Sequence, residues 1–245
     1  MPDSVVFDQR FRGFDKVAQG GYTSGLLARR LPGSARVKLR GPVPMGEPLL
    51  VEEDGGRIEL RSESGVLAEA EPAELDLEVP ERVSPEQAAA VASGYPGHIA
   101  HPYPECFCCG PAREPGDGLR IFPAPLGESD LLAAVWDPGE ELGEDGLLPP
   151  EIVWAAFDCP QLWALMVSSP PDSTDHVVTA SLETEIRRPV PAAGHYVIVS
   201  WPLGVEGRRH HAGAALFDAE GAILAVSRQT AVTAPAGVPL GRFWE

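Results

Sequence analysis

The sequence contains one six-residue motif twice. Leu39-Arg40-Gly41-Pro42-Val43-Pro44 matches Ile186-Arg187-Arg188-Pro189-Val190-Pro191, and each residue of the second copy follows its counterpart by 147 positions. Each copy is preceded by a helical pattern and followed by patterns typical of short strands. Such a repeat predicts two copies of one structural unit, which restricts the fold to arrangements in which that unit can occur twice.

Each unit contains one clear helical pattern. Apolar residues recur at helical spacing between residues 19 and 31, where Pro32-Gly33 supplies the stop. In the second unit, Pro149-Pro150-Glu151 opens a helix that extends to Val167. Pro160 is expected to kink or divide this second helix, because proline has no backbone N–H and its ring clashes with the preceding turn.

Strand patterns follow each helix. Residues 35–40 and 178–186 alternate between apolar and polar side chains. Further apolar runs occur at residues 196–199, 212–217 and 222–226, and turn sequences at residues 53–56 and 218–221. A helix followed by an antiparallel meander, present twice, predicts an α+β fold.

The repeat divides the chain into three expected parts. These are an N-terminal unit of residues 1–80, a connector of residues 81–114, and a C-terminal unit of residues 115–245 whose first strand is expected at residues 116–122. The connector is expected to be ordered, since Ser84-Pro85-Glu86-Gln87 supplies an N-cap, a first-turn proline and a capping-box partner. A short helix up to Ala92, ended by Gly94, is therefore expected there.

Charge and hydropathy exclude several classes of partner. The chain has 19 Lys and Arg against 36 Asp and Glu, a net charge of −17, so a nucleic-acid backbone would be repelled. No apolar run is long enough to span a membrane, and the N-terminus has no signal-peptide pattern. The sequence thus predicts a soluble cytoplasmic protein that binds neither nucleic acid nor membrane.

Three of the four cysteines lie close together in the connector. Cys106, Cys108 and Cys109 stand near His98 and His101, and Cys106-x-x-Cys109 has the spacing of zinc ligands. Structural zinc sites usually show a second pair, which is missing here. A proline-braced loop is therefore the preferred interpretation, with neither metal nor other cofactor expected, and zinc is the alternative.

Three stretches resemble type II, double-hotdog acyl-CoA thioesterases. Residues 19–28 resemble the Gly-Gly start of their central helix. Ala180-Ser181-Leu182-Glu183 with Arg188-Pro189 resembles a strand of their second half, and residues 218–229 resemble their terminal hairpin. The resemblance implies a tandem hotdog, with two antiparallel sheets each wrapped around a central helix and joined edge to edge. A homo-oligomer without a cofactor is also expected.

The resemblance also implies a site. In that family an Asp, a Thr or Ser and a Gln position the attacking water, and the Asp and Gln fall on Glu183 and Gln229. The hydroxyl has no match, because the corresponding strand ends in Trp201-Pro202-Leu203-Gly204. Glu183 and Gln229 are expected to meet at one water near a helix N-terminus. The expected substrate contacts are Gln19, Gly20, Gly21, Tyr22 and Arg187. Gly20 and Gly21 serve equally well as a tight turn before the helix.

Asp158 is a further candidate that depends less on the resemblance. It lies in an otherwise apolar helical stretch, where burial raises a carboxyl pKa toward values suited to proton transfer. The alternative is that Asp158 caps a helix restarting after Pro160.

These features favour hydrolysis of an acyl-CoA or related acyl thioester. The alternative is a catalytically silent double hotdog that binds an acyl ligand or a partner protein. A hotdog dehydratase is less well supported, because no histidine stands near Gln19 or Pro150 to act as its base.

Overall fold

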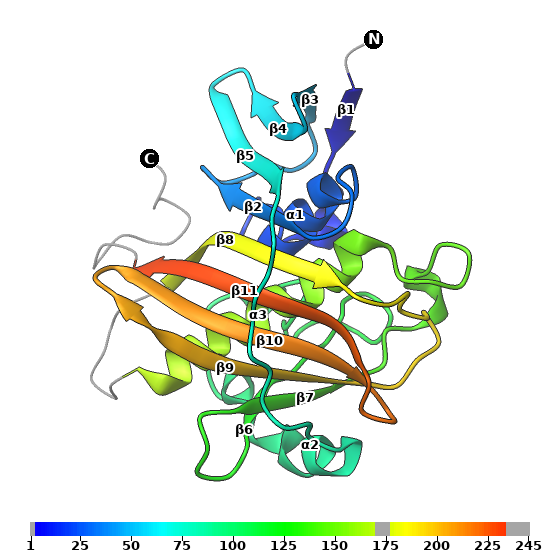
Figure 1. The fold of residues 1–245 in the computed structure, drawn as a ribbon, viewed down its shortest axis with the longest axis vertical. Coiled ribbons are helices and arrows are strands. Elements are labelled where there is room, and N and C mark those ends of the chain that lie inside the picture. The colour runs from blue at the N-terminus through cyan, green and yellow to red at the C-terminus, as the bar shows by residue number, and fades with distance from the viewer. Residues whose placement is uncertain (1–2, 170–176, 234–245) are drawn as a thin grey trace.

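The computed structural model describes residues 3–169 and 177–233, which form one large antiparallel sheet and a few helices (Figure 1). The strands of the first half are β1 (Asp3–Val6), β2 (Ala35–Leu39), β3 (Pro48–Asp54), β4 (Arg57–Ser62) and β5 (Gly65–Pro72). Those of the second half are β6 (Ala124–Pro125), β7 (Leu132–Trp136), β8 (Val177–Ile186), β9 (Tyr196–Glu206), β10 (Arg209–Asp218) and β11 (Ile223–Thr233). The α-helices are α1 (Gly20–Ala28), α2 (Pro85–Val91) and α3 (Pro150–Ser168). Short 3-10 turns are η1 (Gln9–Phe11), η2 (Ala92–Gly94), η3 (Pro96–His98) and η4 (Glu140–Leu142).

The order of the strands is symmetric about the centre of the sheet. It reads β1-β3-β4-β5-β2-β8-β11-β10-β9-β7-β6, so β2 and β8 lie together and the strands on either side follow in corresponding order. Along the chain, β1, α1 and β2 to β5 correspond to β7, α3 and β8 to β11. Arg36 lies directly opposite Glu183 in the β2–β8 pair, and these two residues are 147 positions apart. Counterparts under the sequence repeat therefore face each other at this junction.

Both copies of the Pro-Val-Pro motif form a backbone hydrogen bond with the segment that precedes a helix. The carbonyl of Val43 accepts a hydrogen bond from the N–H of Ala18 at 2.9 Å, and that of Val190 accepts one from Leu148 at 2.7 Å. Ala18 and Leu148 each stand directly before the N-cap residue of a helix, which is Gln19 for α1 and Pro149 for α3. The motif thus has the same structural role in both halves.

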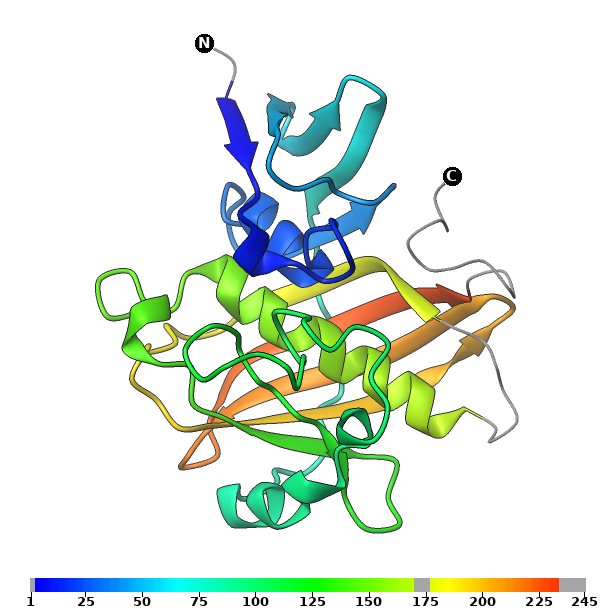
Figure 2. The same cartoon turned by 180° about the vertical axis from the view of Figure 1, so that it is seen from behind.

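Each of the two longer helices covers its own part of the sheet. Helix α1 packs against β2, β4 and β5, and α3 packs against β8 to β11. Figure 2 shows α3 crossing the strands of the second half. The α3 helix continues through Pro160, so Pro160 does not divide it and Asp158 does not cap a second segment. No helix among the described residues has the length and apolar character needed to cross a bilayer.

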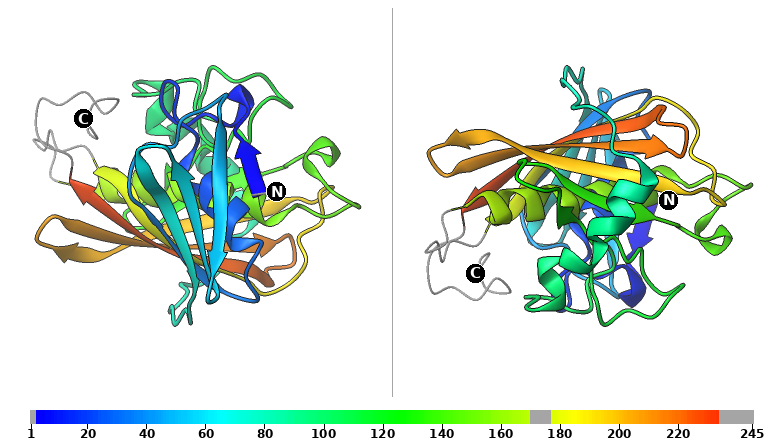
Figure 3. Two further views of the ribbon diagram at one scale, coloured as in Figure 1. Left: turned by 90° about the horizontal axis from the view of Figure 1, so that it is seen from above. Right: turned by 90° about the horizontal axis from the view of Figure 1, so that it is seen from below.

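The segment after β5 crosses the outer face of the second-half strands. Residues 73–84 run across β8 to β11 on the side opposite α3 (Figures 1 and 3). Leu75, Leu77 and Val79 pack on the sheet there, while the acidic residues between them are exposed. The expected helix follows, with the Ser84–Gln87 capping box formed and α2 spanning Pro85–Val91.

One expected strand is absent. Residues 116–122 do not join the sheet; they pair with the cysteine loop, where Leu119 and Ile121 donate to the carbonyls of Phe107 and Cys108. The apolar residues of this stretch are buried by that loop instead, which explains their strand-like pattern.

Candidate functional site

Two glycines on α1 let it lie very close to α3. A Cβ at Gly21 would stand 2.5 Å from the Trp154 carbonyl oxygen, and one at Gly25 would overlap the backbone of Glu151. The two helices run antiparallel, since Gly21 lies near Asp158 whereas Gly25 lies near the start of α3. This contact brings the N-terminus of α1, from the first half, onto the middle of α3, from the second half.

Asp158 lies where the two helices meet, and it accepts four hydrogen bonds. Oδ2 accepts from Gln19 Nε2 at 2.8 Å and from the Gly21 N–H at 2.9 Å. Oδ1 accepts from Thr179 Oγ1 at 2.6 Å and from Gln229 Nε2 at 2.7 Å. Burial raises the pKa of Asp158 to about 6, although the hydrogen bonds from Thr179 and Gly21 oppose the shift. A buried carboxylate is thus held by donors from both halves of the chain.

Thr179 reaches Asp158 because β8 contains a β-bulge. Ser181 lies opposite Thr230 and Thr179 opposite Ala231, so Ala180 is an extra residue in the strand. An inserted residue reverses the alternation beyond it. Strict alternation predicts Thr179 on the face of Glu183, whereas the bulge turns Thr179 toward α3. Sequence reasoning therefore missed Thr179, and nothing in the local sequence marks the bulge.

Glu183 and Gln229 do not meet, contrary to expectation. Gln229 lies opposite Leu182 and faces α3, whereas Glu183 lies opposite Arg228 on the other face of the sheet. Glu183 Oε1 accepts from Arg36 Nε at 2.6 Å, and its other oxygen pairs with Arg228. Burial alone would raise the pKa of Glu183, but these two hydrogen bonds outweigh it and lower the pKa. Its surroundings are those of a carboxylate in an ion-pair network.

Of the expected substrate contacts, Gln19 and Gly21 bind Asp158, whereas Arg187 does not. Gln19 is the N-cap of α1, where its Oε1 accepts from the Tyr22 N–H at 2.6 Å while its Nε2 reaches Asp158. Tyr22 packs by stacking on Phe11, and burial raises its pKa to about 12. Arg187 pairs with Glu185 at 2.8 Å. Among the described residues, it makes no hydrogen bond to the Asp158 cluster, which consists of Asp158, Gln19, Gly21, Thr179 and Gln229.

A small cavity of about 50 Å³ adjoins the Asp158 cluster. Gly20, Thr23 and Thr179 line it, together with apolar side chains that include Phe14 and Leu39. The Gly20 N–H, at the start of α1, has no partner among the described residues. Thr23 Oγ1 and Gln229 Oε1 are buried and also lack a partner in this part of the chain. The cavity therefore adjoins unused hydrogen-bonding groups in an apolar setting.

Two further hollows lie beside this cavity. An open groove of about 740 Å³ shares Gly41 and Pro42 with it. A second cavity of about 60 Å³ shares Phe14 and is mainly apolar, with Leu162, Trp163 and Met166 in its lining. The small cavity beside Asp158 thus shares lining residues with an open groove and with a mainly apolar cavity.

One group of side chains among the described residues has the spacing of metal ligands. The sulfur atoms of Cys106, Cys109 and Cys159 all lie within 4.8 Å of one another. Cys159 follows Asp158 directly on α3, and the three cysteines line the apolar cavity. The sequence showed the Cys106-x-x-Cys109 pair but not that Cys159 joins it.

Comparison with solved structures identifies the fold as a hotdog fold. The tesB protein of Mycobacterium avium subsp. paratuberculosis is 13% identical and aligns over 95% of this chain and 92% of its own, with a TM-score of 0.61. Acyl-CoA thioesterase II TesB2 from Mycobacterium marinum is 17% identical over 92% and 93% of the two chains, with a TM-score of 0.56. A hotdog-fold protein of unknown function from Alicyclobacillus acidocaldarius is 13% identical over 96% and 93%, with a TM-score of 0.54.

These structures share a fold with this chain at low sequence identity. A scan against protein-family models finds no match, and neither does a search of curated proteins. The expected likeness to type II acyl-CoA thioesterase structures is confirmed at the level of the fold.

Proposed function

We propose that this protein hydrolyses an acyl thioester, with acyl-CoA or a related thioester as substrate. The observation that carries the proposal is the buried Asp158 carboxylate, held by four donors from both halves beside a cavity with unused hydrogen-bonding groups. Thioester hydrolysis needs an activated water and donors for the carbonyl oxygen. Groups suited to both tasks border the same small cavity.

The carbonyl oxygen is proposed to bind at the start of α1. Among the described residues, neither the Gly20 N–H at the helix N-terminus nor the Thr23 hydroxyl has a hydrogen-bond partner, and both residues line the cavity. Both become better donors as negative charge develops on that oxygen, because the surroundings are apolar. Gly21, an expected substrate contact, has no part in this proposal, since its N–H already binds Asp158.

The water is proposed to bind at Thr179. The Thr179 hydroxyl donates to Asp158 and accepts from Gln229 Nε2 at 3.0 Å, which leaves one lone pair for a water in the cavity. As water attacks the carbonyl carbon, its proton passes to Thr179 Oγ1 while Thr179 passes its own proton to Asp158. The C–S bond then breaks, and Asp158 returns the proton by the same route to the leaving thiolate.

The two halves are proposed to be tandem hotdog units with a site between them. The symmetric strand order about β2 and β8, the equivalent anchoring of both helices and the whole-length likeness to hotdog structures support this. The first half supplies the carbonyl-binding groups, and the second supplies Asp158, Thr179 and Gln229. Association of chains into a homo-oligomer and a cytoplasmic location stay predictions.

The hollows are proposed to receive the two ends of the substrate. The open groove next to Gly41 and Pro42 would take the thiol portion, and the apolar cavity beside Phe14 the acyl chain. The rival function is binding of an acyl ligand without turnover. It requires the same cavities but no proton acceptor.

A panel of acyl-CoA esters of increasing acyl length tests this proposal. Release of free thiol would be followed with a thiol-reactive dye, and binding of the same esters would be measured by calorimetry. Turnover of any ester above the rate without protein supports hydrolysis. Saturable binding of esters with no thiol release at any length would establish the silent binding protein instead.

A further inference from the structure

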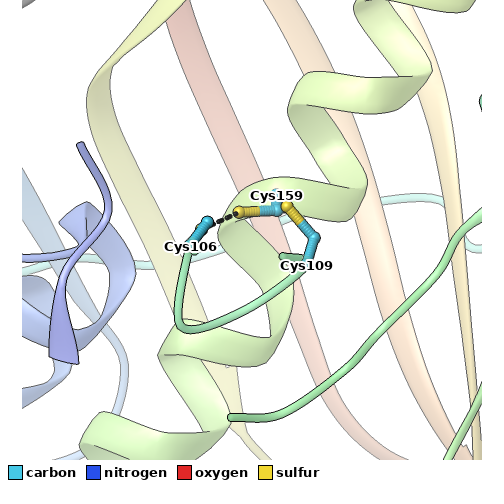
Figure 4. A group of neighbouring side chains, drawn as sticks. All are labelled: Cys106, Cys109 and Cys159. Carbon is cyan, nitrogen blue, oxygen red and sulfur yellow. Dashed lines mark hydrogen bonds between the residues drawn. The ribbon is translucent and has the colours of Figure 1, made fainter. Parts of the chain in front are cut away.

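Three cysteine sulfurs from two distant parts of the chain converge beside Asp158. Cys106 and Cys109 stand at either end of one tight turn, and Cys159 projects toward them from α3 (Figure 4). The sulfur atoms of Cys106 and Cys159 are 3.6 Å apart, and all three lie within 4.8 Å of one another. All three cysteines are buried. The second ligand-bearing segment that the sequence did not reveal is therefore present on α3.

The separation of the Cys106 and Cys159 sulfur atoms matches that of two ligands of one metal ion. A thiolate lies about 2.3 Å from tetrahedral zinc, so two sulfurs on one ion lie roughly 3.8 Å apart. A disulfide requires sulfur atoms at about 2.05 Å, and closing Cys106 onto Cys159 would leave Cys109 without a partner. Three sulfurs that all lie within 4.8 Å of one another are better explained by an ion between them than by one bond.

Hydrogen bonds within the protein hold the loop that carries Cys106 and Cys109 in place. The Gly110 N–H donates to the Cys106 carbonyl at 2.9 Å, and a side chain at Gly110 would strike that turn. Arg113 is buried and donates to the carbonyls of Glu105 and Arg10, both at 2.8 Å. Tyr95 donates to the Cys109 carbonyl at 3.0 Å. A preorganised loop lowers the entropy cost of binding an ion.

His101 supports the sulfur cluster as a hydrogen-bond donor. Its Nδ1 accepts from the Tyr103 N–H at 2.9 Å, which places the proton of the neutral ring on Nε2. Nε2 lies 3.3 Å from Cys109 Sγ and donates to it. An N–H donor to a ligand sulfur stabilises the thiolate form that binds metals.

We propose that Cys106, Cys109 and Cys159 bind one zinc ion, with His101 hydrogen-bonded to the Cys109 ligand. Sulfur ligands from a Cys-x-x-Cys turn select zinc over magnesium or calcium, which prefer oxygen. The three cysteines and His101 line the cavity of about 60 Å³. The ion would fasten the loop to the turn of α3 that carries Asp158.

Metal content of the intact protein tests the proposal without reference to turnover. Wild-type protein would be purified in reductant without a metal-affinity resin and analysed by plasma mass spectrometry, and cobalt would be exchanged for zinc. We expect about one zinc per chain and a thiolate-to-cobalt charge-transfer band. We expect Cys109→Ser to lose both. The matched control is Cys108→Ser, a buried cysteine of the same loop outside the group of three.

Several outcomes would overturn the proposal. They are wild-type protein that binds no zinc after reduction and zinc addition, copper bound in place of zinc, and equal zinc loss in Cys108→Ser and Cys109→Ser. If Cys109→Ser does not fold, the wild-type protein decides alone: removal of zinc by a chelator must lower its melting temperature and abolish the cobalt spectrum. The two proposals can fail separately. Thioester hydrolysis by a protein without zinc would refute the zinc site alone, and zinc binding without turnover would refute the proposed function alone.

Discussion

The two carboxylates proposed from the sequence differ in what surrounds them. In the part of the chain that the structure describes, the donors to the buried Asp158 carboxylate are all uncharged, which leaves its charge available to a substrate group. Glu183 faces two guanidinium groups, which neutralise it. A catalytic base must be able to take a proton, and strong ion pairing opposes that. The local environment therefore favours Asp158 for the role that the resemblance assigned to Glu183.

Thr179→Val tests the hydrogen-bond network of Asp158. The change keeps the shape of the side chain but removes the hydroxyl, so Asp158 Oδ1 loses a donor in a buried site. We expect a loss of about 1–3 kcal/mol in the free energy of unfolding, measured by urea denaturation. Ser181→Ala, in the same strand but on the other face, is the control and should change stability by less than about 0.5 kcal/mol. Equal effects of the two substitutions would refute the network.

At the scale of elements, the α1–α3 contact places the site. Gly21 and Gly25 of α1 are four residues apart and so lie on one helix face, which allows the backbones to approach. Arg29, directly after α1, pairs with Glu151 at the start of α3 at 2.6 Å and fixes the antiparallel arrangement. Any substitution that moves the helices apart also moves Gln19 and Gly21 away from Asp158.

Gly25→Ala tests this contact. The added methyl group would overlap the Glu151 backbone and stand 2.8 Å from Trp154 Cβ, so the helices must separate. We expect a loss of about 1–3 kcal/mol in the free energy of unfolding despite the better helix propensity of alanine. Gly94→Ala is the control, because its methyl group would stand at an ordinary 3.8 Å from Ala124 Cβ. Thermal melting of both variants measures the difference in stability. A melting temperature of Gly25→Ala above that of the wild type would contradict the close packing of the two helices.

The sequence predicted elements with clear local signals and missed what depends on tertiary contacts. The capping box at Ser84, the turns at Gly55 and Gly221 and the helix at Gly20 follow local rules, and all are confirmed. The bulge at Ala180 has no such signal, so Thr179 was placed on the wrong face. The sequence also gave no sign that Gly21 allows α1 to pack closely on α3, because that role depends on a tertiary contact.

At the scale of the whole molecule, the ion pairs of Glu183 join the two halves. Arg36 comes from β2 and Arg228 from β11, so Glu183 on β8 connects strands across the centre of the sheet. The repeat places Arg36 and Glu183 at equivalent positions, and their opposite charges attract where equal residues would repel. The asymmetry between the two copies therefore stabilises their junction.

This network predicts a pH-dependent contribution to stability. The pKa of Glu183 is lowered on folding, so its contribution is complete above the unfolded-state pKa and is lost as pH falls through the folded-state value. Glu183→Gln should therefore cost about 1–3 kcal/mol at about pH 7 and much less at about pH 3. Urea denaturation of wild type and variant across this range measures the difference. A cost that does not change with pH would show that the ion pairs contribute little.

The most direct test of the central claim compares the two carboxylates in one thioesterase assay. With the best substrate of the acyl-CoA panel, Asp158→Asn should lower kcat by about 10²- to 10⁴-fold, as expected when a positioned general base is lost. Glu183→Gln should leave kcat almost unchanged, and melting curves would confirm that both variants are folded. Full activity of Asp158→Asn together with a large loss in Glu183→Gln would contradict the account and place the catalytic carboxylate on the strand.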